Sequence, residues 1–227
     1  MKPTFIALLA LCLCVLMGCG KKEARKPLTK EESAKVIETA IREAAKKPTG
    51  ELTKTDYEKV TTLYLGDNQL TDVKGLEKLT QLTSLALDGD QLTDVDGLEK
   101  LTELTRLHLG GNELIGVPKE LEKLTKLTVL HLSGDQLTDV KGLEKLTKLK
   151  ELHLNANKLT DVAGLEKLDQ LEVLRLDRNQ LTSVKGLEKL TQLELLLLQL
   201  NPDLTKAQID ELKKALPRCN IYSNPTK

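Results

Sequence analysis

Leucines recur along most of this chain in a pattern that combines strand and turn spacings. The segment LTDVKGLEKLT returns almost unchanged from one unit to the next. On the frame LxxLxLxxNxL, the strand core of each unit begins at Leu63, Leu85, Leu107, Leu130, Leu152, Leu174 and Leu196. Successive members of this set lie 22 residues apart, except for one step of 23 after Leu107. Because strand side chains alternate between two faces, the pattern predicts one short strand per unit with its leucines buried.

A fixed period of this length with these leucines is typical of leucine-rich-repeat solenoids. The 22-residue consensus resembles the class found in bacterial internalins and in certain phosphatase regulators, over residues 60 to about 200. The resemblance implies an α/β solenoid with a curved parallel sheet on its concave face, short 3-10 turns on its convex face and helical caps at both ends. We call the outward-pointing side chains of the strands the strand face. A solenoid usually works by presenting such a surface to a partner.

An Asn or Asp follows each strand: Asn68, Asp90, Asn112, Asp135, Asn157, Asn179 and Asn201. In the resembled family, the amide at this position bonds backbone groups and forms a ladder along the solenoid. Asp90 and Asp135 depart from this pattern, because an ionised carboxylate accepts hydrogen bonds but cannot donate them. We therefore expect that the ladder loses a bond at these two units or that the acids keep their protons.

The convex side of each unit has its own signals. Asp72 and its equivalents stand where a helix N-cap is expected. Gly75 and its equivalents predict tight backbone packing, and the repeated Glu77-Lys78 pair predicts a charged, solvent-exposed convex surface. In the third unit, the segment from Gly116 adds one residue and replaces the glycine. There we expect a local change of the convex turn and an uninterrupted sheet.

Helices are predicted on both sides of the repeats. Thr29 and Glu32 form a capping box ahead of an amphipathic segment at 30–46, and a second helix start follows at Thr53. Thr205 precedes another helix over 206–216, and a last strand is predicted at 219–222. We therefore divide the folded part into an N-terminal cap (29–59), seven repeats (60–204) and a C-terminal cap (205–227).

The N-terminus predicts export. Phe5 to Met17 is an unbroken apolar stretch of thirteen residues, shorter than the roughly 20 that span a bilayer, and Lys2 precedes it. Leu16 to Cys19 resembles the lipobox of bacterial lipoproteins, which implies a signal peptide (1–18), acylation of Cys19 and a tether (19–28). Gly20, in place of Asp, implies sorting to the outer membrane of a bacterial cell envelope. An ordinary secretory signal remains the alternative.

Composition excludes several functions. The chain has 34 basic and 34 acidic residues, so it lacks the basic excess that nucleic-acid binding requires. It contains no phosphate-binding loop, GxSxG elbow, HExxH or paired-cysteine motif. We therefore predict a protein that is not an enzyme, with no catalytic residue and no cofactor.

Three histidines, the histidine row, share one strand position in adjacent units: His108, His131 and His153. Parallel strands lie about 4.8 Å apart, so the imidazoles should stack. They could bind one metal ion or support catalysis, but a repeated Leu-His-Leu triplet needs no such role. Glu151 beside His153 is the only acidic neighbour expected, so the sequence favours no metal.

The strand face is the predicted binding surface. Its candidate contact residues are Tyr64, Arg106, His108, His131, Glu151, His153, Arg175, Asp177 and Arg178. Tyr and Arg are frequent energetic centres of protein interfaces. The sequence predicts a monomeric, lipid-anchored binding or scaffolding protein with a protein partner of unknown identity. Two alternatives stay open: a metal-binding or enzymatic role at the histidine row, and a surface adhesin resembling internalins.

Overall fold

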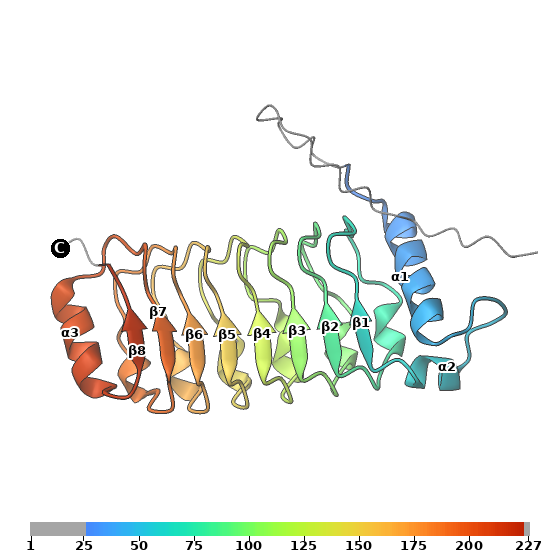
Figure 1. Ribbon diagram of the computed structural model, residues 1–227. Helices are drawn as coiled ribbons and strands as arrows, with labels where there is room; N and C mark the ends of the chain where they lie inside the picture. Colours follow the sequence, from blue (N-terminus) through green and yellow to red (C-terminus); the bar gives the residue numbers. More distant parts are fainter. Residues whose placement is uncertain (1–25, 225–227) are drawn as a thin grey trace, which may run out of the picture.

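The computed structural model describes residues 26–224, which form a parallel sheet of eight strands in chain order. The strands lie side by side along the molecule, with the short helical turns behind them (Figure 1). Their bounds are β1 (Thr62–Tyr64), β2 (Ser84–Ala86), β3 (Arg106–His108), β4 (Val129–His131), β5 (Glu151–His153), β6 (Val173–Arg175), β7 (Leu195–Leu197) and β8 (Asn220–Tyr222). The predicted leucine-rich-repeat solenoid is confirmed. The predicted signal peptide and lipidated Cys19 lie outside the described residues.

The sheet stays in register through the longer third unit. Leu85 pairs with Leu107, and Leu107 pairs with Leu130 in the same way despite the 23-residue step. The extra residue is taken up on the convex side, where η3 spans Lys119–Lys123 and begins after Pro118. Both expectations for this unit are confirmed. The register matters for function because it places equivalent side chains of successive units beside one another.

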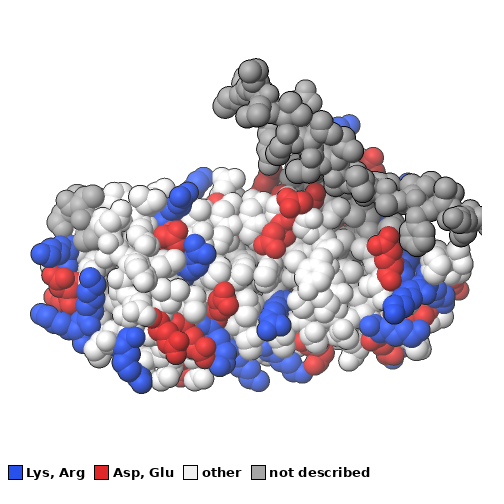
Figure 2. All heavy atoms as spheres, viewed as in Figure 1, with Lys and Arg blue, Asp and Glu red and all other residues white. Residues whose placement is uncertain are grey.

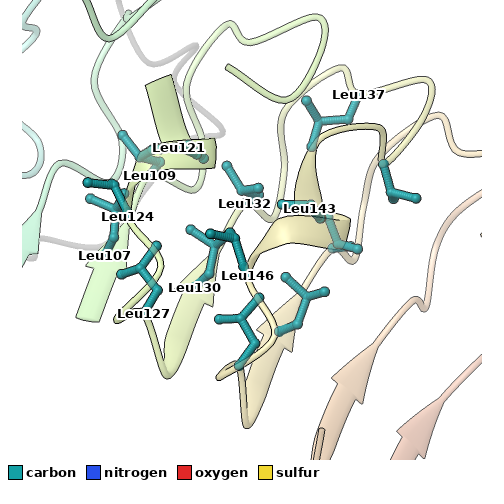
Figure 3. Packing of buried hydrophobic residues seen from close by; sticks show 14 of the residues in the cluster. Leu107, Leu109, Leu121, Leu124, Leu127, Leu130, Leu132, Leu137, Leu143 and Leu146 are labelled. Atoms are coloured by element: carbon teal, nitrogen blue, oxygen red, sulfur yellow. The ribbon is translucent and has the colours of Figure 1, made fainter. Parts of the chain in front are cut away.

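The core is a continuous column of leucines between the sheet and the convex turns. Leu107 and Leu130 from the strands point toward Leu124 and Leu146 from the turns (Figure 3). All four side chains are fully buried. Burying a leucine stabilises a fold by about 1.5–3 kcal/mol, so units with this many buried leucines hold the strand face rigidly.

Short 3-10 turns form the convex side, as expected: η1 (Leu76–Lys78), η2 (Leu98–Lys100), η3, η4 (Leu143–Lys145), η5 (Leu165–Lys167) and η6 (Leu187–Lys189). The glycine before each turn except η3 has φ between 100° and 108°. A Cβ on Gly142 would lie 3.5 Å from its nearest neighbour, which is ordinary contact. The expected tight packing is therefore not the reason for glycine; the left-handed backbone is.

Polar groups on the convex side also differ from expectation. The Asp72 carboxylate accepts the backbone N–H of Lys74 at 2.7 Å and closes a turn, whereas the residue that caps η1 is Gly75. Glu77 does more than face solvent, because its carboxylate accepts a hydrogen bond from the backbone N–H of Gly75 at 2.6 Å. The same bond recurs in four later units. A hydrogen bond from each glutamate's own backbone N–H, followed by this bond from the glycine N–H, lowers the pKa of the Glu144 and Glu166 carboxyls.

Helices cover both ends of the solenoid. At the N-terminal end, α1 (Lys30–Ala44) has the predicted capping box and packs Ile37 and Ile41 against the first unit, and α2 (Lys54–Glu58) follows. At the other end, α3 (Lys206–Ala215) buries Ile209 and Leu212. Of the helices in residues 26–224, none has the length and apolar character needed to cross a membrane.

The ladder behind the strands is present, with two defects. Asn157 accepts the N–H of Leu137 at 3.1 Å and donates to two carbonyls, those of Leu132 and Leu154. Asp90 and Asp135 keep the accepting half through Oδ1, but the Oδ2 atom of each is buried without a hydrogen-bond partner among residues 26–224. Burial raises the pKa of Asp90 to about 6 and that of Asp135 to about 7. The expected loss of a ladder bond is therefore present at both units, and the raised pKa values make both acids easier to protonate than an exposed aspartate.

Candidate functional site: the strand face

The central line of the strand face takes one residue from each strand. Strand pairing aligns Tyr64, Ala86, His108, His131, His153, Arg175, Leu197 and Tyr222 in that order. Aromatic residues stand at both ends, with Tyr64 75% and Tyr222 54% exposed. The four central residues, His108 to Arg175 in this order, are polar and half-buried, and Ala86 and Leu197 separate them from the tyrosines.

The predicted stack of histidines is present. The ring centroids of His108 and His131 lie 4.1 Å apart at an interplanar angle of 32°. Those of His131 and His153 lie 3.9 Å apart and are nearly parallel, at 6°. These spacings follow from strand pairing, which fixes the backbone distance between the three residues.

Carboxylates flank the stack on both sides. Oε1 of Glu151 lies 2.9 Å from Nε2 of His153 and 3.4 Å from Nε2 of His131. Oδ2 of Asp88 lies 3.6 Å from Nδ1 of His108. Glu151 thus contacts two histidines, whereas the sequence suggested one. Asp88 is an acidic neighbour of His108 that strand spacing does not predict.

Electrostatics favour neutral imidazoles at the centre of the stack. Burial, followed by the neighbouring His108, lowers the pKa of His131. Burial and then His131 lower the pKa of His153 to about 4, despite the nearby Glu151 carboxylate. Both directions agree with the physical expectation that stacked, desolvated imidazoles resist protonation.

The remaining predicted contact residues separate into two groups. Nε of Arg175 lies 3.7 Å from Oδ1 of Asp177, and neither atom has a hydrogen-bond partner within the described part of the chain. Arg106 is exposed at the first position of β3, and Arg178 is exposed in the loop after β6 with φ of 58°. The structure therefore joins Arg175 and Asp177 to the histidine row and leaves Arg106 and Arg178 at its margins.

Charge on this face is mixed. Figure 2 shows acidic and basic side chains interspersed with many uncharged ones over the strands. Two contacts on this face could not be predicted from the sequence. Tyr222 lies beside Leu197 only because β8 extends the sheet, and Asp88 contacts His108 through the loop after β2. Sequence spacing places residues within a unit well, but it does not predict these side-chain contacts.

Comparison with known proteins supports the repeat assignment. Residues 58–100, 102–144 and 125–167 match the family described as Leucine Rich repeats (2 copies). A comparison with curated protein sequences found no match.

Three of the solved structures that share this fold come from two bacteria. An internalin C2 from Listeria monocytogenes has 26% identity and a TM-score of 0.77, covering 85% of each chain. An internalin F from the same species has 29% identity and a TM-score of 0.76, covering 90% of this chain and 62% of that one. A leucine-rich-repeat protein of Leptospira interrogans has 28% identity and a TM-score of 0.60, covering 75% of this chain and 51% of that one. The chain is thus a leucine-rich-repeat solenoid whose structural neighbours include internalins.

Proposed function

We propose that this chain is a non-catalytic lipoprotein of the bacterial cell envelope that binds a protein partner through its strand face. The observation that carries the proposal is the central line of that face, which has a polar centre on paired strands and an exposed tyrosine at each end. Leucine-rich-repeat proteins are typically interaction scaffolds without catalytic activity, and the internalin-like neighbours are consistent with this class.

The strand face has the composition of an interface more than that of a catalytic cleft. Tyr64 and Tyr222 offer large amphipathic surfaces, and tyrosine is a frequent energetic centre of interfaces. Both charge signs lie between them, so a partner with complementary charges would be oriented as well as held. Ordered repeats lose little conformational entropy on binding, because their strands are already fixed by the core.

The membrane part of the proposal rests on the sequence around Cys19. Several acyl chains would hold the protein stably, since each buried methylene contributes about 0.8 kcal/mol. The tether (19–28) would keep the solenoid near its membrane, because ten extended residues span only about 35 Å. In this arrangement the protein acts as a monomer that gathers its partner at the envelope.

Outward display as an adhesin is the second candidate, and the internalin neighbours are the observation that favours it. Treating intact cells with a membrane-impermeant biotin reagent separates the two locations. Labelling of the many exposed lysines in intact cells would support display. Protection in intact cells, with labelling after lysis, would support a position inside the envelope.

The binding proposal is tested by affinity capture with matched charge reversals. Arg106→Glu alters the strand face, and Lys100→Glu makes the same charge change on the exposed convex side. We expect the wild-type protein and Lys100→Glu to capture the same envelope protein and Arg106→Glu to lose it. Equal capture by all three would argue against the strand face, and a Tyr64→Ala variant would repeat the comparison at the other margin.

A further inference from the structure

Two histidines and a glutamate converge at the centre of the strand face. The coordinating atoms of His131, Glu151 and His153 all lie within 4.8 Å of one another, and this is the group of metal-ligand type found among residues 26–224. Sequence spacing argued against a metal because it placed Glu151 beside His153 alone. The structure places the carboxylate within reach of both rings.

We propose that His131, Glu151 and His153 bind one divalent transition-metal ion, with Zn²⁺ as the ion that suits these ligands best. Two imidazole nitrogens and one carboxylate oxygen are a ligand set that zinc accepts, with further coordination positions left open. Calcium and magnesium prefer oxygen ligands, and this group offers a single carboxylate. The set therefore selects for a zinc-like ion.

The distances between ligand atoms are compatible with one shared ion. Zinc bonds to nitrogen or oxygen are about 2.0–2.2 Å long, so two ligands at a tetrahedral angle lie about 3.3–3.5 Å apart. Oε1 of Glu151 is 3.4 Å from Nε2 of His131 and 2.9 Å from Nε2 of His153. An expansion of a few tenths of an ångström on the shorter side would admit the ion.

The backbone that carries the ligands is held in place. Glu151 and His153 are two residues apart on β5, so both side chains point to the strand face. His131 is the direct partner of His153 in the register of β4 and β5. Leu152, between the two ligands on β5, and its partner Leu130 on β4 are fully buried in the core. Ligands on paired strands are positioned more accurately than ligands on loops.

The side chains retain the freedom that coordination requires. Parallel rings direct their nitrogen lone pairs in parallel, so His131 and His153 must tilt for both to reach one ion. Their side chains are 22% and 15% exposed, and that of Glu151 is 38% exposed. Tilting therefore occurs on an open face, not inside the core. Arg175 is the next residue along, and its charge is offset by Asp177 at 3.7 Å.

His108 provides an internal control. Its ring stacks on His131, but its Nδ1 faces Asp88 and it is outside the convergent group. A metal bound by the stack as a whole would need His108, whereas the proposed site does not. The site is also independent of the proposed partner, because binding is measured on the purified protein alone.

Zinc titration by calorimetry, with Mg²⁺ in parallel, tests the proposal. We expect one Zn²⁺ per wild-type chain and no saturable binding of Mg²⁺. His131→Ala, His153→Ala and Glu151→Gln should each weaken zinc binding at least about tenfold, a change that even the loss of a ligand's supporting hydrogen bond can cause. His108→Ala should bind zinc as the wild type does. Circular dichroism of each variant confirms that the fold is retained.

Nitrogen-15 spectra of the histidine rings give an independent measurement. Stoichiometric zinc should shift Nε2 of His131 and of His153 and leave the His108 ring nitrogens nearly unchanged. Absence of a stoichiometric site would overturn the proposal and leave Glu151 as a plain hydrogen-bond acceptor for two rings. A site that survives Glu151→Gln and His153→Ala, or that requires His108, would equally contradict it.

Discussion

Oδ1 of Asp135 accepts the backbone N–H of Asn112 at 3.0 Å and joins two consecutive repeats. Its Oδ2 is buried and has no hydrogen-bond partner in the described part of the chain, at the position where the asparagine-containing units place an amide nitrogen. The same relationship holds for Asp90 and Asn68. Each ladder defect therefore combines a retained acceptor with a missing donor.

Restoring the donor should stabilise the fold. Asp135→Asn should allow Nδ2 to donate to a strand carbonyl as Asn157 does, with a gain of about 0.5–1.5 kcal/mol for the recovered hydrogen bond. The free energy of unfolding in urea measures the effect. Asp139→Asn is the matched control, because Asp139 is exposed and uses only an acceptor oxygen. A loss of stability in both Asp135→Asn and Asp90→Asn would show that the carboxylates serve another purpose.

The same carboxylates predict a pH dependence. Their pKa values are raised from 3.8 to about 6 in Asp90 and to about 7 in Asp135. Between pH 3.8 and about 7, the folded state therefore binds more protons than the unfolded chain. Their contribution to stability is therefore fully present below about pH 4 and is lost as the pH rises through about 7. Urea unfolding of the wild type and of Asp90→Asn/Asp135→Asn should diverge over this range. Parallel pH profiles would contradict the assignment.

Backbone conformation predicts opposite effects for two exchanges of glycine and alanine. Gly142 has φ of 100° and Ala156 has φ of 57°, both in the left-handed region. Gly142→Ala should destabilise the protein by at least about 1 kcal/mol, and Ala156→Gly should stabilise it by up to about 1 kcal/mol. Thermal unfolding compares the two variants directly. Equal losses of stability in both would mean that side-chain contacts of Ala156 outweigh its backbone strain.

The C-terminal cap should be required for solubility. Leu212 on α3 is 3% exposed and packs in the common core, whereas Lys213 beside it is exposed. Leu212→Asp should detach α3, expose the last unit and cause association, while Lys213→Asp should leave the protein monomeric. Size-exclusion chromatography distinguishes these outcomes. A monomeric, equally stable Leu212→Asp variant would show that α3 is dispensable.

The proposed lipid anchor rests on Cys19, which lies outside the described residues. Cys19→Ser should abolish labelling by radioactive palmitate and leave the unprocessed precursor, because it removes the sulfur that we propose is acylated. Expression of the wild type and the variant in a bacterial host, followed by detergent extraction, provides the measurement. Normal processing of the variant would support an ordinary secretory signal in place of a lipobox.

The sequence alone predicted the repeat, the strand positions and the register. Leucine periodicity is a local signal, and a single inserted residue is accommodated where it leaves Leu107 and Leu130 paired. Burial of identical leucines in each unit leaves few alternative arrangements. The stacking of the histidine row followed from the same repeat, because paired strands bring equivalent residues to a fixed separation.

Only the tertiary structure decided how side chains meet between units. The position of Glu151 between two imidazoles, the contact of Asp88 with His108 and the left-handed glycine before η4 depend on rotamers and backbone angles. A repeat pattern specifies neither of these. The sequence therefore determined which residues share the strand face, and the packing of adjacent strands determined which of them can act together.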